Sequence, residues 1–161
     1  MSSILFVCWA NRFRSPLAAA FFCKYLEQVA DRGNWLVGSA GTWAQAGLPP
    51  DGRAIQDARE RGLDIKSHRS RQVSSVLLSQ SNLVLVMEAG QKEALQVEFP
   101  NERQKVFLLT EVAGGVPYDI PDPSGPDGAT HQEIANELEE LIKAGFENIY
   151  NFALNSHNLL R

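Results

Sequence analysis

Short apolar runs alternate with amphipathic segments along most of the chain. Residues 4–7 (Ile-Leu-Phe-Val) are apolar throughout, which predicts a buried strand. Residues 15–30 follow, and in them Phe21, Tyr25 and Val29 recur at helical spacing. The pattern therefore predicts a strand and then a helix whose three large side chains face a sheet.

The same alternation continues toward the end of the chain. Three further apolar runs predict strands, at residues 35–39, 82–87 and 105–109. Helices are predicted between and after them, at residues 51–61 with Asp51 as N-cap, at a short segment after 67–71, at 88–97 and at 130–155. Strands that alternate with helices indicate an α/β fold with a doubly wound parallel sheet. A length of 161 residues predicts one domain over residues 1–161.

The loop between the first strand and the first helix has the most distinctive chemistry. Cys8 ends the strand, and Ser15-Pro16 opens the helix, where proline is tolerated in the first turn. The five residues between Cys8 and Arg14 must turn the chain, which directs backbone N–H groups and a helix N-terminus toward one place. Ligands of doubly wound sheets bind at this carboxyl end of the strands. The spacing therefore predicts an anion-binding loop with a sulfur at its base.

Three side chains of this loop suit a phosphate ester. We expect Cys8 to be a thiolate placed for in-line attack on phosphorus, because N–H dipoles and a helix N-terminus favour the anion. Arg14 can hold two phosphate oxygens in a bidentate fork, and the Ser15 hydroxyl can donate to the sulfur. The alternative is that Cys8 is a small buried hydrophobic residue, as free cysteines commonly are. Spacing and position alone leave both interpretations open.

A phosphate ester also needs a proton donor for its leaving group. The Gly- and Pro-rich residues 114–128 offer Asp119, Asp122 and Asp127, on a loop that a functional carboxyl can occupy. Asp122 is the best candidate, because Pro123 restricts its backbone to extended conformations. Acidic loop residues are more often solvated, so the alternative for each is a surface role.

Composition excludes several classes of function. The net charge of −4 gives no sign of nucleic-acid binding, and no apolar run reaches the roughly 18 residues of a membrane span. The chain begins directly with a strand, so we expect no signal peptide. Two cysteines make no disulfide framework and indicate a cytoplasmic protein, with Cys23 as a buried packing residue.

Residues 7–16 (Val-Cys-Trp-Ala-Asn-Arg-Phe-Arg-Ser-Pro) resemble the signature of low-molecular-weight protein tyrosine phosphatases, in the bacterial branch. Residues 39–42 (Ser-Ala-Gly-Thr), the polar residues 68–71, the end of the apolar run at 85–87 and Asp122-Pro123 follow in the same order and spacing. The resemblance covers nearly the whole chain. It implies a four-stranded parallel sheet with helices on both faces and a metal-free mechanism through a phosphocysteine, with no cofactor.

The resemblance also implies roles for single residues. Cys8 is expected to be the nucleophile, Arg14 the phosphate clamp and Asp122 the general acid and then base. Ser15 is expected to stabilise the thiolate. The remaining supporting residues are Asn11, which tolerates positive φ, and Ser39 and His68, which hydrogen-bond to the loop. The phosphate-binding loop as a whole consists of Trp9, Ala10, Asn11, Arg12, Phe13, Arg14 and Ser15.

The chain departs from the family pattern at several positions. Phe13 stands where a second loop cysteine is frequent, so Cys8 is predicted to oxidise irreversibly. Ser124 follows Asp-Pro in place of the usual aromatic residue, and we expect Trp9 and Trp43 to form the aromatic part of the substrate pocket instead. Arg12 occupies a position that is often aliphatic and is also assigned to the pocket.

The resemblance implies a phosphotyrosine phosphatase. Its expected partners are a phosphotyrosine protein, such as a tyrosine kinase, and inorganic phosphate or other oxyanions in the loop; the protein is expected to be a monomer. A protein arginine phosphatase of the same fold ranks second, since the cationic Arg12 would repel phosphoarginine. An arsenate reductase is disfavoured, because no cysteine follows Cys23. A non-catalytic phosphate-binding module is the alternative from another class.

Overall fold

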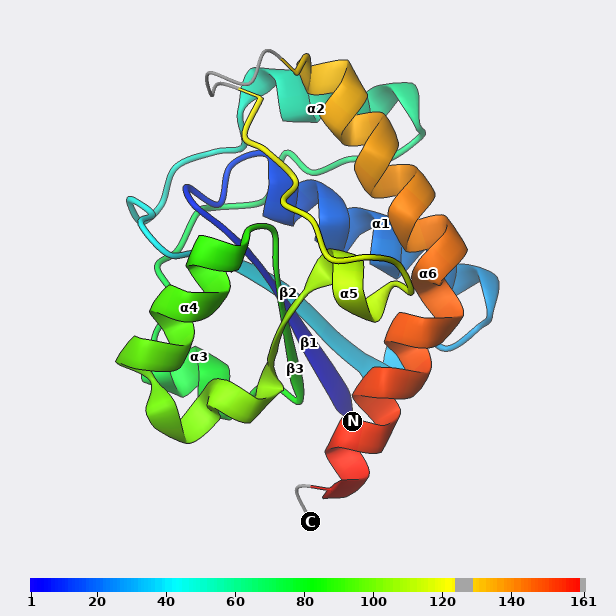
Figure 1. The fold of residues 1–161 in the computed structure, drawn as a ribbon. Coiled ribbons are helices and arrows are strands. Elements are labelled where there is room, and N and C mark those ends of the chain that lie inside the picture. Colours follow the sequence, from blue (N-terminus) through cyan, green and yellow to red (C-terminus); the bar gives the residue numbers. More distant parts are fainter. Residues whose placement is uncertain (124–128, 160–161) are drawn as a thin grey trace.

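A four-stranded parallel sheet forms the centre of the molecule (Figure 1). The computed structural model of the chain describes residues 1–123 and 129–159. The strands are β1 (Ser2–Cys8), β2 (Trp35–Gly41), β3 (Leu83–Val86) and β4 (Val106–Leu108), in the order β2-β1-β3-β4. β1 pairs in parallel with β2 on one side and with β3 on the other, as in a doubly wound sheet. The predicted fold class and the four strands are confirmed.

Helices cover both faces of this sheet. The helices are α1 (Arg14–Gln28), α2 (Gly52–Glu60), α3 (Ser75–Ser79), α4 (Ala89–Glu98), α5 (Leu109–Val112) and α6 (His131–Leu159), and two 3-10 helices are η1 (Arg32–Asn34) and η2 (Pro100–Lys105). α1 and α6 lie over one face, and α3 and α4 over the other (Figure 1). None of the helices in the described parts of the chain is long and apolar enough to cross a bilayer.

Successive residues of β1 divide between two cores, because side chains of a strand alternate in direction. Ile4, Phe6 and Cys8 belong to the core beneath α1 and α6. Leu5 and Val7 belong to the core beneath α3 and α4. Cys8 therefore ends the strand on the face that α1 covers, next to the helix that follows it.

The predicted helices form, with differences at their ends. Asp51 is the N-cap of α2, and its side chain accepts a hydrogen bond from the Arg53 backbone N–H at 2.9 Å. Phe21 is fully buried, whereas the prediction for Val29 is wrong, since this side chain is 54% exposed. Val29 is the C-cap of α1, so the chain leaves the helix before the apolar spacing places this residue on the sheet.

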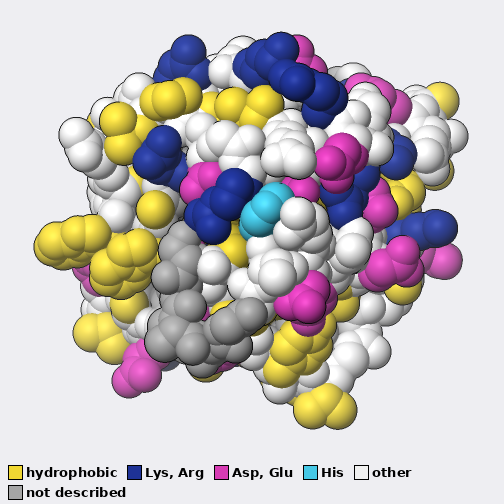
Figure 2. Space-filling model, turned by 90° about the horizontal axis from the view of Figure 1, so that it is seen from above, with side chains coloured by type: hydrophobic (Ala, Val, Ile, Leu, Met, Phe, Trp, Pro, Cys, Tyr) yellow, Lys and Arg dark blue, Asp and Glu magenta, His cyan; other side chains and the backbone are white. Residues whose placement is uncertain are grey.

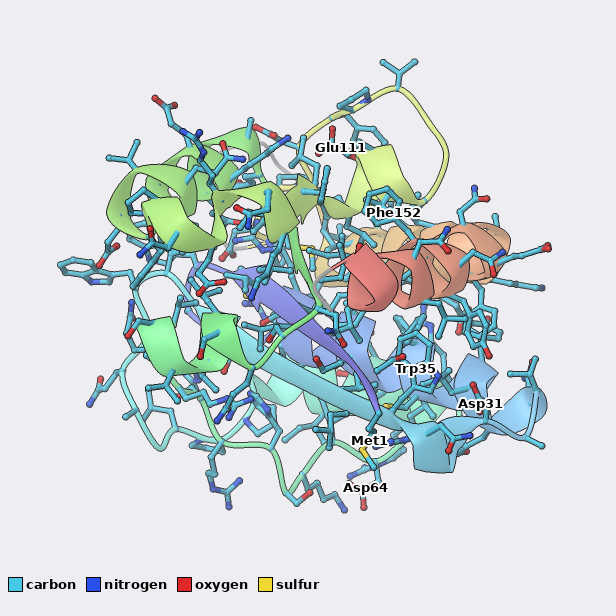
Figure 3. The ribbon with its side chains drawn as sticks, turned by 90° about the horizontal axis from the view of Figure 1, so that it is seen from below. Met1, Asp31, Trp35, Asp64, Glu111 and Phe152 are labelled. Atoms are coloured by element: carbon cyan, nitrogen blue, oxygen red, sulfur yellow. The ribbon has the colours of Figure 1, made fainter. Side chains whose placement is uncertain are left out.

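The Asp31 carboxylate lies beside Trp35, the first residue of β2, at the amino-terminal end of the strands (Figure 3). Asp31 Oδ2 accepts hydrogen bonds from Trp35 Nε1 at 2.9 Å and from the Tyr150 hydroxyl at 2.7 Å. Hydrogen bonds from Asn34, Tyr150 and Trp35 lower the pKa of this carboxyl. One side chain thus joins the start of β2 to the second half of α6.

Candidate active site

The loop between β1 and α1 lies at the carboxyl end of the central strand. Cys8 is only 2% exposed, and its Sγ lies 3.0 Å from the Ser15 Oγ. α1 begins at Arg14, so the N-terminal amides of a 15-residue helix follow the loop directly. Figure 2 looks onto this end of the molecule, where Lys and Arg side chains are interspersed with Asp and Glu, and exposed hydrophobic side chains lie at its edge. The amides at the start of α1 make the loop a suitable place for an anion.

Asn11 holds the loop in shape from the inside. Its φ of 60° lies in the left-handed region, which asparagine tolerates better than most residues. Its Nδ2 donates to Ser15 Oγ at 2.8 Å and to Ser39 Oγ at 2.9 Å. Its Oδ1 accepts from the Arg71 backbone N–H at 3.0 Å. Because Ser15 Oγ accepts from Asn11, its own hydrogen can point to the Cys8 sulfur.

His68 supports the same turn from outside. Its Nε2 lies 2.7 Å from the carbonyl oxygen of Asn11, and a carbonyl only accepts, so Nε2 carries the proton. Burial lowers the pKa of His68, and the charges of Arg71 and Arg69 lower it further against the opposing effect of the Asn11 hydrogen bond. His68 is therefore a neutral donor at physiological pH, and the structure places Asn11, Ser39 and His68 in one network, as predicted.

The Arg14 side chain connects the loop to the residues that follow β3 and to the segment that ends at Asp122. It is 2% exposed, although it belongs to the first turn of α1. Its Nη1 donates to the Ile120 carbonyl at 2.8 Å and lies 3.4 Å from Glu88 Oε1. Its Nη2 lies 3.6 Å from Asp122 Oδ2. The Arg14 guanidinium therefore lies beside Asp122, the residue that the sequence predicts to be the general acid.

Asp122 reaches this position because the residues just before it are anchored. The backbone N–H of Ile120 donates to the Met87 carbonyl at the end of β3 at 2.9 Å, and the Ile120 side chain is fully buried. Asp119 has another role, since its Oδ1 accepts from the backbone N–H of Ala89 at the start of α4 at 2.8 Å. Asp127, the third candidate acid, lies outside the described residues, and so does Ser124.

The two tryptophans assigned to the substrate pocket lie against each other at the rim. The Trp9 and Trp43 rings are stacked with centroids 6.0 Å apart, and both are well exposed. Gly41 lets their loops approach, because a Cβ there would lie 2.4 Å from the Trp9 carbonyl oxygen. Arg12 and Trp43 line the same hollow, and Arg12 Nε donates to the Pro49 carbonyl at 2.9 Å. The rim of the loop thus carries an aromatic surface and a cation.

Phe13 packs inward rather than toward the rim. Its ring meets His131 edge-on at 6.5 Å between centroids, and Arg53 lies over it at 5.9 Å. His131 Nδ1 in turn lies 2.8 Å from Oδ2 of Asp57, a carboxylate with no exposed surface. The first residue of α6 is therefore tied both to α2 and to the loop.

Sequence reasoning missed Glu88 and the pair Asp57–His131. Glu88 directly follows Val86-Met87 at the carboxyl end of a strand, which is where ligand-binding residues gather, so its position was the available signal. The pair left no such signal, because its members are 74 positions apart. No cluster of three or more potential metal ligands is found among residues 1–123 and 129–159.

Comparisons with known proteins agree with this geometry. The family model described as "Low molecular weight phosphotyrosine protein phosphatase" matches residues 3–151. The chain is 37% identical over 144 residues to a probable low molecular weight protein-tyrosine-phosphatase, EpsP, of Ralstonia nicotianae, covering 89% of this chain and 93% of that one. It is 35% identical to a protein-arginine-phosphatase of Geobacillus stearothermophilus, covering 86% and 90%. The solved structure of Vibrio vulnificus Wzb in complex with benzylphosphonate matches with a TM-score of 0.78 at 34% identity, covering 91% and 98%.

Proposed function

The chain belongs to the low molecular weight phosphotyrosine protein phosphatase family, and we propose that it hydrolyses phosphotyrosine in proteins, as relatives named protein-tyrosine-phosphatases do. We further propose that Cys8 is the nucleophile, Arg14 the phosphate clamp and Asp122 the general acid and base. The loop amides of residues 9–15 would hold the phosphoryl oxygens, with Asn11, Ser39 and His68 keeping the loop in shape.

In the first step, the Cys8 thiolate attacks phosphorus in line with the ester bond. The S–P bond forms as the P–O bond to the tyrosine breaks, and Asp122 gives its proton to the departing phenolate oxygen. Arg14 and the loop amides stabilise the charge on the equatorial oxygens of the transition state. The products are a free tyrosine and a phosphocysteine.

In the second step, water replaces the sulfur on phosphorus. Asp122, now ionised, takes a proton from the water as it attacks, and the S–P bond breaks. The Ser15 hydroxyl donates a hydrogen bond to the returning thiolate and keeps its proton, which the 3.0 Å contact with the sulfur allows. Inorganic phosphate leaves, and the enzyme regains its starting protonation.

The proximity of Arg14 to both parts of the site carries this proposal. The guanidinium follows the Cys8 loop in sequence and lies 3.6 Å from Asp122, although the two residues are 108 positions apart. A phosphoryl group held by Arg14 would therefore have the sulfur on one side and a carboxyl near its leaving oxygen. If Asp122 were only a surface carboxylate and Cys8 only a packing residue, nothing would require Arg14 to lie next to both the Cys8 loop and Asp122.

The test compares aryl phosphate hydrolysis by Cys8→Ser and Asp122→Asn, with Asp119→Asn as matched control. Cys8→Ser should abolish hydrolysis, and the wild type should remain active with a chelator present. Asp122→Asn should lower kcat by about 100-fold or more with a phenyl leaving group and by less with p-nitrophenol, which leaves without a proton. Asp119→Asn should keep kcat within about threefold. Activity that persists in Cys8→Ser, or that requires a divalent metal, contradicts the mechanism.

The matching arginine phosphatase makes phosphoarginine the second candidate substrate. Two features of the rim favour phosphotyrosine. The exposed Trp9–Trp43 stack suits an aromatic ring, and the Arg12 guanidinium would repel the cationic side of phosphoarginine. Hydrolysis rates of paired peptides that differ only in phosphotyrosine or phosphoarginine decide between them, and a higher kcat/KM for phosphoarginine would reverse the ranking.

We also propose the setting in which the enzyme works. Residues 1–161 would act as a single domain and a monomer in the cytoplasm, where Cys8 stays reduced. The protein partner would present a phosphotyrosine on an accessible segment, as an autophosphorylated tyrosine kinase does. Size-exclusion chromatography with light scattering tests the monomer, and trapping of phosphoproteins by Cys8→Ser tests the partner.

A further inference from the structure

A second cavity lies behind the catalytic loop, on the other side of its supporting residues. It is open to solvent, has a volume of about 590 Å³ and is lined by α1, η1, β2 and the segment that follows α2. Cys23 is at its α1 wall and Val37 at its β2 wall, and Ile65 belongs to the following segment. This volume is within the range of small-molecule sites. Cys23, predicted to be buried, is only partly so, because it faces this cavity.

Positive charge predominates around the cavity. Four of its residues are cationic, and two are carboxylates. The cations are Lys24, Arg32, Arg69 and Arg71, and the carboxylates are Glu27 and Asp64. Cys23 and Arg32 both line the cavity. Burial raises the pKa of the Cys23 thiol, and the charge of Arg32 opposes part of that rise.

The three arginines are held by backbone carbonyls rather than by carboxylates. Arg32 Nη1 donates to the Trp35 carbonyl, Arg71 Nε to that of Ser39, and Arg69 Nη1 to that of Lys66, each at 2.9 Å. None of the three forms an ion pair within the part of the chain that the structure describes. Their positions are therefore fixed without a direct carboxylate partner, although Glu27 and Asp64 line the same cavity, and this leaves their N–H groups able to bind an anion.

Glycine at position 38 makes room for one of these guanidiniums. A Cβ on Gly38 would lie 2.7 Å from Arg71 Nη2, so the guanidinium lies directly across the edge strand of the sheet. Arg32 and Arg71 both line this cavity and a second hollow beside it, and Gly38 lines both as well. Two guanidiniums therefore line the same hollows on either side of one stretch of β2.

The same residues hold the catalytic loop. The Arg71 backbone N–H donates to Asn11 Oδ1, and Ser39 and His68, which also line the cavity, hydrogen-bond to Asn11. A ligand drawn to Arg71 would thus act on groups that contact Asn11 directly. Asn11 in turn positions Ser15 beside the Cys8 sulfur.

We propose that this cavity is a regulatory site for a small phosphate compound with two or more negative charges. A guanidinium can bind phosphate oxygens through two parallel N–H groups. The apolar side chains of Val37, Leu63 and Ile65 can contact an organic part of the ligand. Binding shifts the Asn11 network and lowers turnover without competing with substrate. The binding part of the proposal stands by itself, and only the effect on turnover rests on the proposed function.

Binding is tested through the thiol in the cavity wall. Cys8→Ser leaves Cys23 as the single thiol, because the chain has two cysteines. The rate of Cys23 alkylation by iodoacetamide is measured at constant ionic strength with tripolyphosphate, with ATP or with chloride alone. We expect a phosphate compound to slow alkylation about fivefold or more. Arg32→Gln in the same background should remove the protection, and Arg103→Gln, with the same charge change on η2, should keep it.

The outcomes separate the parts of the proposal. Protection by tripolyphosphate identifies the phosphate chain as sufficient, and protection by ATP alone identifies an organic phosphate. No protection by either, or equal protection in Arg32→Gln, overturns the site, because an anion bound only in the catalytic loop does not depend on Arg32. In the active protein, inhibition should have a non-competitive component that Arg32→Gln removes and Arg103→Gln keeps. Purely competitive inhibition alongside Cys23 protection overturns the regulatory effect and leaves the binding site standing.

Discussion

The buried pair Asp57–His131 provides a test of how α2 and α6 are held together. Asp57 has no exposed surface, and its Oδ1 has no hydrogen-bond partner, so His131 supplies the main compensation for its charge. Replacing His131 by alanine would leave a buried carboxylate without that donor. Removing one partner of a buried pair typically costs about 3–5 kcal/mol.

The expected loss is at the low end of that range. The His131 side chain is 19% exposed, so water can partly replace it next to Asp57. We therefore expect His131→Ala to lower the free energy of unfolding by about 3 kcal/mol. For a chain of this length, such a loss corresponds to roughly 6–12 °C in Tm. Urea unfolding at pH 7 measures the first quantity, and calorimetry the second.

A double-mutant cycle supplies the control. Asp57→Ala removes the buried charge, so His131→Ala in the Asp57→Ala background should cost much less than it does alone. The double variant should be no less stable than His131→Ala by more than about 0.5 kcal/mol. If the two single losses simply add, the pair makes no coupled contribution, and the reasoning from burial is wrong.

Three further predictions follow from other parts of the structure. Gly41→Ala should lower kcat and cost about 1–3 kcal/mol in unfolding experiments, because its Cβ would press on the Trp9 carbonyl; Gly90→Ala, where a Cβ meets nothing within 4 Å, should be neutral or slightly stabilising. Asp31→Asn should lower Tm at pH 7 but not near pH 2. The pKa of Asp31 is lowered by folding, so its contribution is present above its unfolded pKa of about 3.9 and is lost as the pH falls through the folded value. Equal Tm losses at both pH values contradict that assignment. Peroxide should inactivate the wild type irreversibly, whereas Phe13→Cys should recover activity with dithiothreitol, since it adds a neighbouring thiol that can trap the sulfenic acid. Full recovery of wild-type activity with dithiothreitol contradicts this prediction.

The features that sequence analysis predicted depend on neighbouring residues. The strand that ends at Cys8, the turn and the start of α1 are contiguous, so their apolar pattern and the spacing to Arg14 were sufficient to place them. The Asp51 N-cap was likewise a local signal. The prediction for Val29 failed because helical spacing does not show where a helix ends.

The unpredicted features depend on contacts between distant segments. The proximity of Asp122 to Arg14 requires Ile120 to bind the end of β3, which no local pattern indicates. Asp57 resembles an ordinary solvated carboxylate in the sequence, and the strand end before Glu88 does not show that this side chain lies beside Arg14; only tertiary packing brings the two carboxyls to His131 and Arg14. The cavity behind the loop is a further example, since three separate segments form its walls.

The hydrogen bond from Arg14 to the Ile120 carbonyl has a consequence for how this enzyme could change over evolution. In the proposed mechanism, Arg14 binds the anion and also holds the segment that carries Asp122. The position of Asp122 and the affinity for the anion therefore cannot change independently, because a substitution on either side of this hydrogen bond alters both. New substrate preferences are therefore easier to acquire at the rim formed by Trp9, Arg12 and Trp43, where side chains can vary without changing the Arg14–Ile120 hydrogen bond.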